Sequence, residues 1–183
     1  MAGEVLNTYI IVEQGDKVLF IDKHAAHERM NFDRMKAEGY DPMSQTLLAP
    51  AVCRLSPEEH AALTARLPLL EEFGFAAEDF GGGALIVRRA PFDVDPGDIE
   101  ATLTEIARKL LSTGSADPAA ARDELLHTMA CKAAIKGGWR TSPQELERMA
   151  RAVMSGQVRY CPHGRPVAIE LTRGQLEKQF KRA

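Results

Sequence analysis

Two short runs of apolar and β-branched residues open the chain, at Tyr9–Glu13 and Val18–Asp22. Only a few residues around Gly15 separate them, and this spacing predicts an antiparallel hairpin. No β-branched residue occurs from His24 to Met43, so the pattern becomes helical there, with Gly39 as a candidate C-terminal cap. The second strand therefore leads directly into a helix, and functional side chains often lie at such a junction.

The middle of the chain alternates helical and turn signals. Residues 56–59 (SPEE) read as a capping box, which predicts a helix toward Leu70 that Pro68 kinks or shortens. Three glycines at 81–83 precede an apolar run without the Gly-Lys-Ser/Thr of a phosphate-binding loop, so they predict a turn and then a strand. An apolar stripe at helical spacing indicates a helix that faces the core. Its members are Ile99, Leu103, Ile106 and Leu110.

Small and turn-forming residues at 112–119 (STGSADPA) predict a linker between two lobes. Beyond the linker we expect a helix from about Ala120 to Lys136 that stops at the glycines 137–138. The remaining expected elements are a helix opened by a capping box at 142–145 (SPQE), a strand at Val167–Leu171 and a last helix capped at Thr172 and reaching Phe180.

The composition is that of a globular chain. Its 183 residues are 45% hydrophobic and 27% charged, unlike a disordered protein, and they suffice for one domain or two small lobes. No apolar run approaches the roughly 20 residues of a membrane helix, and no secretory signal is visible, so we expect a cytoplasmic protein outside the membrane. Three cysteines in such a chain indicate free thiols, metal ligands or core residues and not a disulfide framework.

The net charge of −3 conceals an asymmetry along the chain. Residues 1–130 carry 12 Lys and Arg against 22 Asp and Glu, whereas residues 131–183 carry 11 against 4. The basic part suits a polyanion and the acidic part repels one, so nucleic acid binding by this chain alone should be weak and sensitive to salt. A solvated surface is the alternative interpretation.

Candidate metal ligands occur at the start of the first predicted helix. His24 and Glu28 are four residues apart, so both project from one helix face and can share an ion; a surface hydrogen bond is the alternative. Asp22, at the end of the preceding strand, offers a further carboxylate or caps the helix.

A second set of candidate ligands lies near the end of the chain. Cys161 and His163 flank a proline, and in an extended segment both point to one side, a spacing suited to zinc. Cys131 is either another ligand or a buried small side chain. With His24 and Glu28 these residues match the inventory of a two-metal hydrolase, whose cations hold the attacking water and the leaving oxygen of a phosphodiester. Thiolates favour zinc, and an oxygen-rich second position suits manganese.

Four stretches of the chain resemble motifs of one family, the C-terminal endonuclease and dimerisation domain of MutL proteins in DNA mismatch repair. Residues 22–28 (DKHAAHE) followed by Asp33 resemble its DQHAxxExxxxE motif, and residues 130–132 (ACK) resemble its ACR-type motif. Residues 161–166 reproduce its CPHGRP motif, and residues 180–182 (FKR) resemble its terminal FxR. Four motifs in this order are highly specific.

Three positions depart from the family pattern. Lys23 stands in place of Gln, Lys132 in place of Arg, and Asp33 in place of the last Glu. None of them is a proposed ligand. The side chain of Asp33 is one methylene shorter than that of the family's Glu, so we assign it no role.

The resemblance implies a dimeric α/β (α+β) fold of two lobes. The dimerisation lobe would come from residues 1–50 and 120–183, with an external regulatory lobe, residues 51–119, inserted between them. Domains of this family nick one strand of duplex DNA, with zinc near the motif cysteines and histidines and manganese supporting catalysis. By matching position, the metal site would consist of Asp22, His24, Glu28, Cys131, Cys161 and His163. Arg165 and Arg182 would lie close to it and bind DNA phosphates.

Residues 45–50 (QTLLAP) resemble the QxLLxP-type segment by which bacterial family members dock on the replicative sliding clamp. In this interpretation Gln45 is the anchor, and Leu47, Leu48 and Pro50 enter an apolar pocket from an extended segment. An apolar connector between lobes is the alternative. Docking would bring a domain of weak DNA affinity to its substrate.

The resemblance thus predicts a homodimeric, metal-dependent nicking endonuclease that binds DNA, the sliding clamp and, through the full-length protein, a mismatch-recognition protein. One alternative is a zinc-stabilised dimerisation and clamp-binding module without catalysis. Another is a metal-free interaction domain whose cysteines belong to the core. No stretch resembles the ATPase of family proteins, so we expect a C-terminal fragment without ATP-dependent regulation of its own.

Overall fold

The fold is described from a computed structural model, over residues 1–112, 117–136 and 138–182. The chain divides into two compact units: unit 1 is Met1–Asp33 with Ala134–Ala183, and unit 2 is Arg34–Ala133. Each unit combines one antiparallel sheet with helices, which confirms the α+β class. The bounds of the units differ from the expected ranges 1–50, 51–119 and 120–183, and the roles assigned to those ranges stay predictions.

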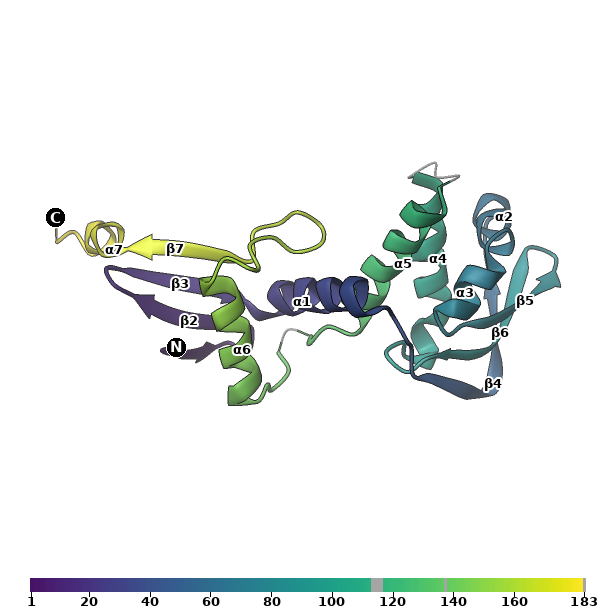
Figure 1. The fold of residues 1–183 in the computed structure, drawn as a ribbon, viewed down its shortest axis with the longest axis horizontal. Coiled ribbons are helices and arrows are strands. Elements are labelled where there is room, and N and C mark those ends of the chain that lie inside the picture. Colours follow the sequence, from purple (N-terminus) through teal and green to yellow (C-terminus); the bar gives the residue numbers. More distant parts are fainter. Residues whose placement is uncertain (113–116, 137, 183) are drawn as a thin grey trace. The chain divides into compact units, whose positions relative to one another are not determined.

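Unit 1 is built on a four-stranded antiparallel sheet of order β1-β2-β3-β7 (Figure 1). The expected hairpin is confirmed, with Ile10 of β2 opposite Ile21 of β3. β3 also pairs with β7, where Phe20 lies opposite Ile169, so the two ends of the chain join in one sheet. The strands are β1 (Gly3–Val5), β2 (Tyr9–Gln14), β3 (Lys17–Asp22) and β7 (Ala168–Thr172).

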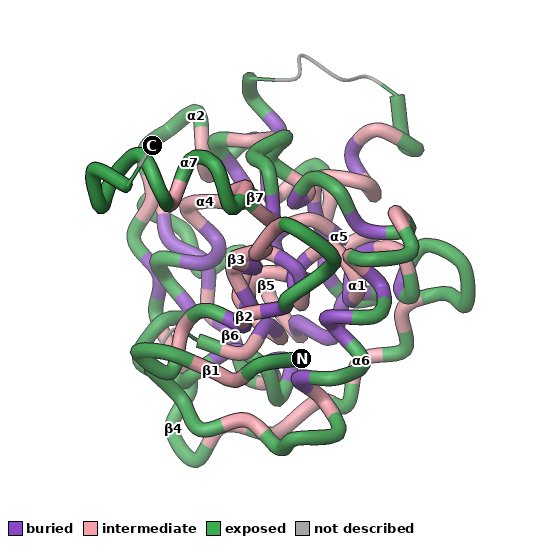
Figure 2. Tube along the Cα trace, turned by 90° about the vertical axis from the view of Figure 1, so that its left-hand side faces the viewer, coloured by how far each residue is buried: buried purple, intermediate pink, exposed green. Residues whose placement is uncertain are grey.

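Three helices accompany this sheet: α1 (Lys23–Glu38), which runs past the end of unit 1, α6 (Pro143–Met154) and α7 (Arg173–Gln179). Buried Ile10 and Val12 of β2 belong to the same apolar core as Leu146 and Met149 of α6. α7 begins at a complete capping box formed by Thr172 and its third helical residue, as expected. Figure 2 shows α7 as an almost entirely exposed helix.

Unit 2 contains a three-stranded antiparallel sheet of order β4-β6-β5. Its strands are β4 (Ser44–Arg54), β5 (Ala76–Gly81) and β6 (Ala84–Pro91). The glycines at 81–83 form the expected turn between β5 and β6, and all three adopt positive φ, which glycine tolerates without strain. The pairing of β4 with β6 shifts register between Thr46 and Ala51, inside the segment that resembles a clamp motif.

The helices of unit 2 are α2 (Pro57–Thr64), α3 (Leu67–Glu72), the 3-10 turn η1 (Pro96–Asp98), α4 (Ile99–Ser112) and α5 (Pro118–Lys132). The capping box at Ser56 is confirmed, and the apolar stripe of α4 is buried. The helix expected to reach Leu70 splits before Leu67, because Pro68 lacks an N–H and its ring crowds the preceding turn. None of the described helices is both long and apolar enough to cross a membrane.

α5 ends at Lys132, four residues earlier than the sequence predicted. The backbone of Ile135 instead hydrogen-bonds to side chains of α1: its N–H donates to His27 and its carbonyl oxygen faces His24. A peptide group used in this way cannot also continue the helix. Residues 113–116 of the predicted linker lie outside the described residues. The glycine at 137, where the helix was expected to stop, also lies outside them. α5 begins just after Asp117, which caps it.

Candidate metal centre

The first turn of α1 is fixed by the strands and segments that surround it. Asp22 Oδ1 accepts a hydrogen bond from Ala25 N at 3.1 Å, so this carboxylate caps the helix. Asp22 N donates to Val167 O at 2.8 Å, and Lys23 N donates to Thr8 O at 3.1 Å. These hydrogen bonds therefore fix the start of α1, from which the α1 side chains of the candidate site project.

Glu28 lies between two imidazole rings. Its Oε1 is 3.2 Å from His24 Nε2, and its Oε2 is 3.8 Å from His163 Nδ1. The Glu28 side chain is only 7% exposed, whereas both rings are partly open to solvent. Unit 1 thus brings together three of the predicted site residues, two from α1 and one from the segment that precedes β7.

The backbone of Ile135 sets the protonation pattern of two histidines. Its carbonyl oxygen lies 2.8 Å from His24 Nδ1, so that ring nitrogen carries the proton. In neutral His24 the lone pair is then on Nε2, the nitrogen that faces Glu28. Metal-binding histidines commonly donate their other ring N–H to a backbone carbonyl in this way. The carbonyl oxygen of Ile135 thus holds the ring of His24 in an orientation that would suit a metal ligand.

His27 also contacts Ile135, but here the ring nitrogen accepts the hydrogen bond and the backbone N–H donates it. Ile135 N donates to His27 Nδ1 at 3.0 Å, which leaves the proton of neutral His27 on Nε2, 3.6 Å from Glu145 Oε1. His27 therefore holds the segment that orients His24. Sequence reasoning missed this role, because the partner peptide group lies 108 residues away and carries no side-chain signal.

The electrostatics of the cluster favour a positive charge beside Glu28. The hydrogen bond with Glu28 raises the pKa of His24 above its ordinary value of 6.5; burial opposes this rise, and the carbonyl of Ile135 and the charge of Asp22 support it. A buried carboxylate needs a counter-charge. Either a proton on His24 or a bound cation can supply it.

A tight turn carries Cys161 and His163. Gly164 N donates to Cys161 O at 2.9 Å, and Cys161 N donates to Arg165 O at 2.8 Å. The side chain of Cys161 packs in the apolar core of unit 1 and is 2% exposed, whereas His163 is exposed and faces Glu28. Gly164 adopts a φ of +78°, which glycine tolerates without strain and which reverses the chain after His163.

The other predicted residues of the metal site and DNA contacts belong to other elements of the chain. Cys131 is in the last turn of α5, in unit 2, and is partly buried. Arg165 is exposed in the turn, and the guanidinium of Arg182 lies 5.8 Å from the ring of Phe180. Asp33 accepts two hydrogen bonds from Arg29 Nε, at 2.9 and 3.0 Å, so its carboxylate is held in an ion pair along α1.

The clamp-like segment belongs to the edge strand β4 of unit 2. Leu48 is fully exposed, Pro50 is exposed and Leu47 is partly buried. Gln45 is also partly buried, and its amide nitrogen lies 3.5 Å from Val94 O. The segment is therefore extended and presents an apolar side chain to solvent, as docking on a partner requires.

Lys23 is a second residue whose role the sequence did not reveal. It is fully buried, and its ammonium group donates to Glu4 Oε1 at 2.6 Å, to Trp139 O at 2.5 Å and to Thr141 Oγ1 at 3.1 Å. These three acceptors match the three N–H donors of a lysine. The only signal in the sequence was that Lys23 replaces the family's Gln; its partners lie 19 to 118 residues away.

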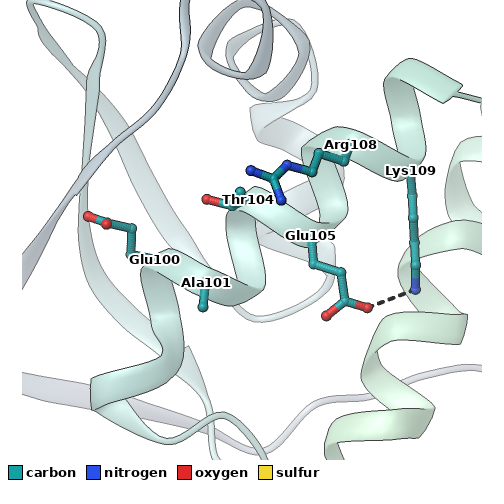
Figure 3. A pocket seen from close by; sticks show the side chains of 6 residues that line it. All are labelled: Glu100, Ala101, Thr104, Glu105, Arg108 and Lys109. Carbon is teal, nitrogen blue, oxygen red and sulfur yellow. Dashed lines mark ion pairs between the residues drawn. The ribbon is translucent and has the colours of Figure 1, made fainter.

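A separate pocket of about 380 Å³ lies along α4 in unit 2 (Figure 3). Its charged groups already have partners: Glu105 pairs with Lys109 at 2.9 Å, and Arg108 pairs with Glu59 at 2.9 Å. It contains none of the predicted site residues. The candidate functional site is therefore the cluster around Glu28.

Comparison with known proteins supports the assignment to this family. The sequence profile described as "MutL C terminal dimerisation domain" matches residues 2–141. Curated proteins described as "DNA mismatch repair protein MutL" are similar over almost the whole chain: that of Acidiphilium cryptum is 38% identical, that of Methanothrix thermoacetophila 35% and that of Caldanaerobacter subterraneus subsp. tengcongensis 33%. The matches cover 99%, 100% and 100% of this chain but 32%, 33% and 31% of those proteins, so the chain spans about a third of their length. The chain belongs to the family of MutL C-terminal dimerisation domains.

Proposed function

We propose that this chain is a homodimeric, metal-dependent DNA-nicking domain of a mismatch repair protein. The observation that carries the proposal is the buried carboxylate of Glu28 between ring nitrogens of His24 and His163. Imidazole nitrogens and a carboxylate are ligands that zinc accepts in catalytic sites. The mismatch repair context comes from the names of the relatives.

His24, Glu28 and His163 would hold a divalent cation, with Cys131 and Cys161 as proposed thiolate ligands and Asp22 as an additional carboxylate. The proposed ions are zinc, which suits imidazole and thiolate, and manganese, which suits carboxylates. Cations at such a site activate water and stabilise the negative charge that develops on a phosphodiester.

The protein's own contribution is orientation and charge. Ile135 holds the His24 ring so that Nε2 stays directed at Glu28, and the burial of Glu28 limits competition from water. Arg165 and Arg182, both exposed in unit 1, would bind the phosphates of the DNA strand.

Nicking of supercoiled plasmid with added manganese tests the proposal. We expect nicking by the unaltered protein and its loss after Glu28→Gln, which keeps the shape of the side chain but removes the charge. Glu13→Gln changes an exposed carboxylate of β2 and is the matched control that should nick normally. Undiminished nicking by Glu28→Gln would reject the assignment.

The second candidate is a zinc-stabilised dimerisation and clamp-binding module without catalysis. It is favoured by the hydrogen bond from Ala25 N to Asp22 Oδ1, because a structural role as helix cap suffices to explain Asp22. In this case the unaltered protein would bind zinc tightly and fail to nick plasmid with manganese. If the unaltered protein does nick, Asp22→Asn tests whether Asp22 acts beyond capping, since an asparagine still caps the helix but supplies no charge for a metal.

Docking on a sliding clamp is a further part of the proposal. It is supported by the exposed Leu48 on an edge strand and by the shifted register of β4 at this segment. Gln45 would exchange its long contact with Val94 O for the partner. Docking would also compensate for the weak DNA affinity expected from the acidic unit 2.

A further inference from the structure

Trp139 is the only tryptophan of the chain, and it is 59% exposed. It lies four residues after Ile135, whose backbone holds His24 and His27. The candidate metal centre and this exposed ring therefore belong to the same unit and share a supporting segment. The site proposed above assigns no role to the ring.

The backbone at Gly138 and Trp139 is held by three hydrogen bonds, two of them made by Trp139. Its carbonyl oxygen accepts from the buried Lys23 Nζ at 2.5 Å, and its N–H donates to Lys136 O at 3.2 Å. The neighbouring Gly138 N donates to Asn7 O, in the turn between β1 and β2, at 2.9 Å. A side chain carried by so constrained a backbone loses less entropy when a partner covers it.

Basic residues lie next to the ring in space or in sequence. Lys136 Nζ lies 5.7 Å from the centroid of the Trp139 ring, and the next residue, Arg140, is exposed. Unit 1 as a whole has 13 Lys and Arg against 10 Asp and Glu, a balance of +3, whereas unit 2 has 10 against 16, a balance of −6. An anionic partner would therefore approach through unit 1.

An aromatic ring with flanking cations suits nucleic acid, because the cations bind phosphates and the ring stacks on a base. Protein interfaces are enriched in Trp and Arg but depleted of lysine, so it is Lys136 beside the ring that favours nucleic acid over a protein partner. We propose that Trp139 stacks on a base of the DNA substrate while Lys136 and Arg140 bind the adjacent phosphates.

This inference rests on the proposed function and specifies its substrate. A ring stacks only on a base whose face is open, so the preferred ligand is DNA with an unstacked base, as in a single-stranded stretch, a flap or a kinked step. The ring would hold such a base beside the strand that is cut, and the protein would prefer distorted over regular duplex.

The single tryptophan makes the test direct, because all tryptophan fluorescence of the protein comes from this ring. A single-stranded oligonucleotide is titrated into the full chain at low salt without added manganese, so that binding is observed without cleavage. We expect saturable quenching of the emission that salt reverses, and weaker quenching by regular duplex of equal length.

Variants give a second readout, the affinity for a fluorescently labelled single strand. Trp139→Ala should weaken binding about tenfold, whereas Trp139→Phe should retain most of the affinity because a phenyl ring still stacks. Phe80→Ala removes an exposed aromatic ring of unit 2 and should bind as the unaltered protein does.

Unchanged affinity of Trp139→Ala, or binding of the unaltered protein without quenching, would overturn the inference. So would emission that shifts with protein concentration but not with DNA, since that would place the ring in a protein contact. Failure of catalysis looks different: the protein would then bind and quench normally but fail to nick plasmid with manganese.

Discussion

The carboxylate of Glu28 is the central group of the candidate site. Its two oxygens face His24 and His163, and its burial makes an uncompensated negative charge costly. A proton on His24 and a metal ion at the same place are therefore competing counter-charges. Metal affinity should fall as the pH is lowered through the pKa of His24, since the proton then occupies the ligand atom.

The first prediction concerns the titration of His24. The hydrogen bond with Glu28 is the largest cause of its raised pKa, so Glu28→Gln should lower that pKa toward or below 6.5 in metal-free protein. A raised pKa stabilises the fold fully below 6.5 and loses that contribution as the pH rises through the pKa of the folded state. NMR of the imidazole proton resonances, followed as a function of pH, measures the pKa of His24 in the unaltered protein and in Glu28→Gln. An unchanged titration in Glu28→Gln would contradict the assigned cause.

The second prediction concerns the buried ammonium group of Lys23. Lys23→Met leaves Glu4 and Thr141 without their donor, and we expect a loss of about 3 kcal/mol in the free energy of unfolding. Lys17→Met is the matched control: its ion pair with Glu170 is exposed, and its loss should cost less than about 1 kcal/mol. Urea denaturation measures both. Equal losses in the two variants would show that burial of Lys23 is not what matters.

At the scale of elements, local sequence patterns were sufficient to predict a helix, strand or cap wherever the interactions that form it are local. The hairpin of β2 and β3, the capping box at Ser56, the helix cap at Thr172 and the stripe of α4 were all predicted and confirmed. The end of α5 was not, because the backbone of Ile135 is held by His24 and His27 from more than 100 residues away. No window of sequence around Ile135 contains that information.

The same distinction applies to the candidate site. The spacing of His24 and Glu28 on one helix face was readable, and so was a role for His163 from its motif. The burial of Cys161 was not, since the residues of the core that surrounds it come from distant parts of the sequence. Contacts made through the fold, such as the hydrogen bond from the Lys23 ammonium group to the carbonyl oxygen of Trp139, become visible only in three dimensions.

The third prediction concerns the exposed segment of β4. Leu48→Ala removes a fully exposed side chain, so the free energy of unfolding should change by less than about 0.5 kcal/mol. Binding to the sliding clamp, measured by surface plasmon resonance, should weaken about tenfold or more if Leu48 fills a pocket. Val52→Ala, also exposed on β4 but outside residues 45–50, should bind normally. Equal affinity of Leu48→Ala and the unaltered protein would contradict docking through this segment.

At the scale of the whole molecule, the net charges of the two units are opposite in sign. Unit 1 is basic and contains the candidate metal centre, whereas unit 2 is acidic and contains the exposed β4 segment. In the proposed function, such a division would separate contact with DNA from contact with a protein partner. The family to which the chain belongs is named for dimerisation, which would double both surfaces in the assembled protein.

The fourth prediction follows from the proposed homodimer. If unfolding separates the protomers, mass action makes the thermal midpoint rise with protein concentration. Thermal unfolding followed by circular dichroism over a hundredfold range of concentration tests this, together with the mass from sedimentation equilibrium. A monomeric mass and a midpoint independent of concentration would contradict a stable dimer.

The most direct test of the metal centre is anomalous diffraction at the zinc edge from crystals of the protein grown with zinc. The proposal predicts a peak at bonding distance, about 2.0–2.2 Å, from a carboxylate oxygen of Glu28 and a ring nitrogen of His24 or His163. Crystals of Glu28→Gln should lose the peak. A zinc-loaded crystal with no peak near Glu28, or with the same peak in Glu28→Gln, would contradict it.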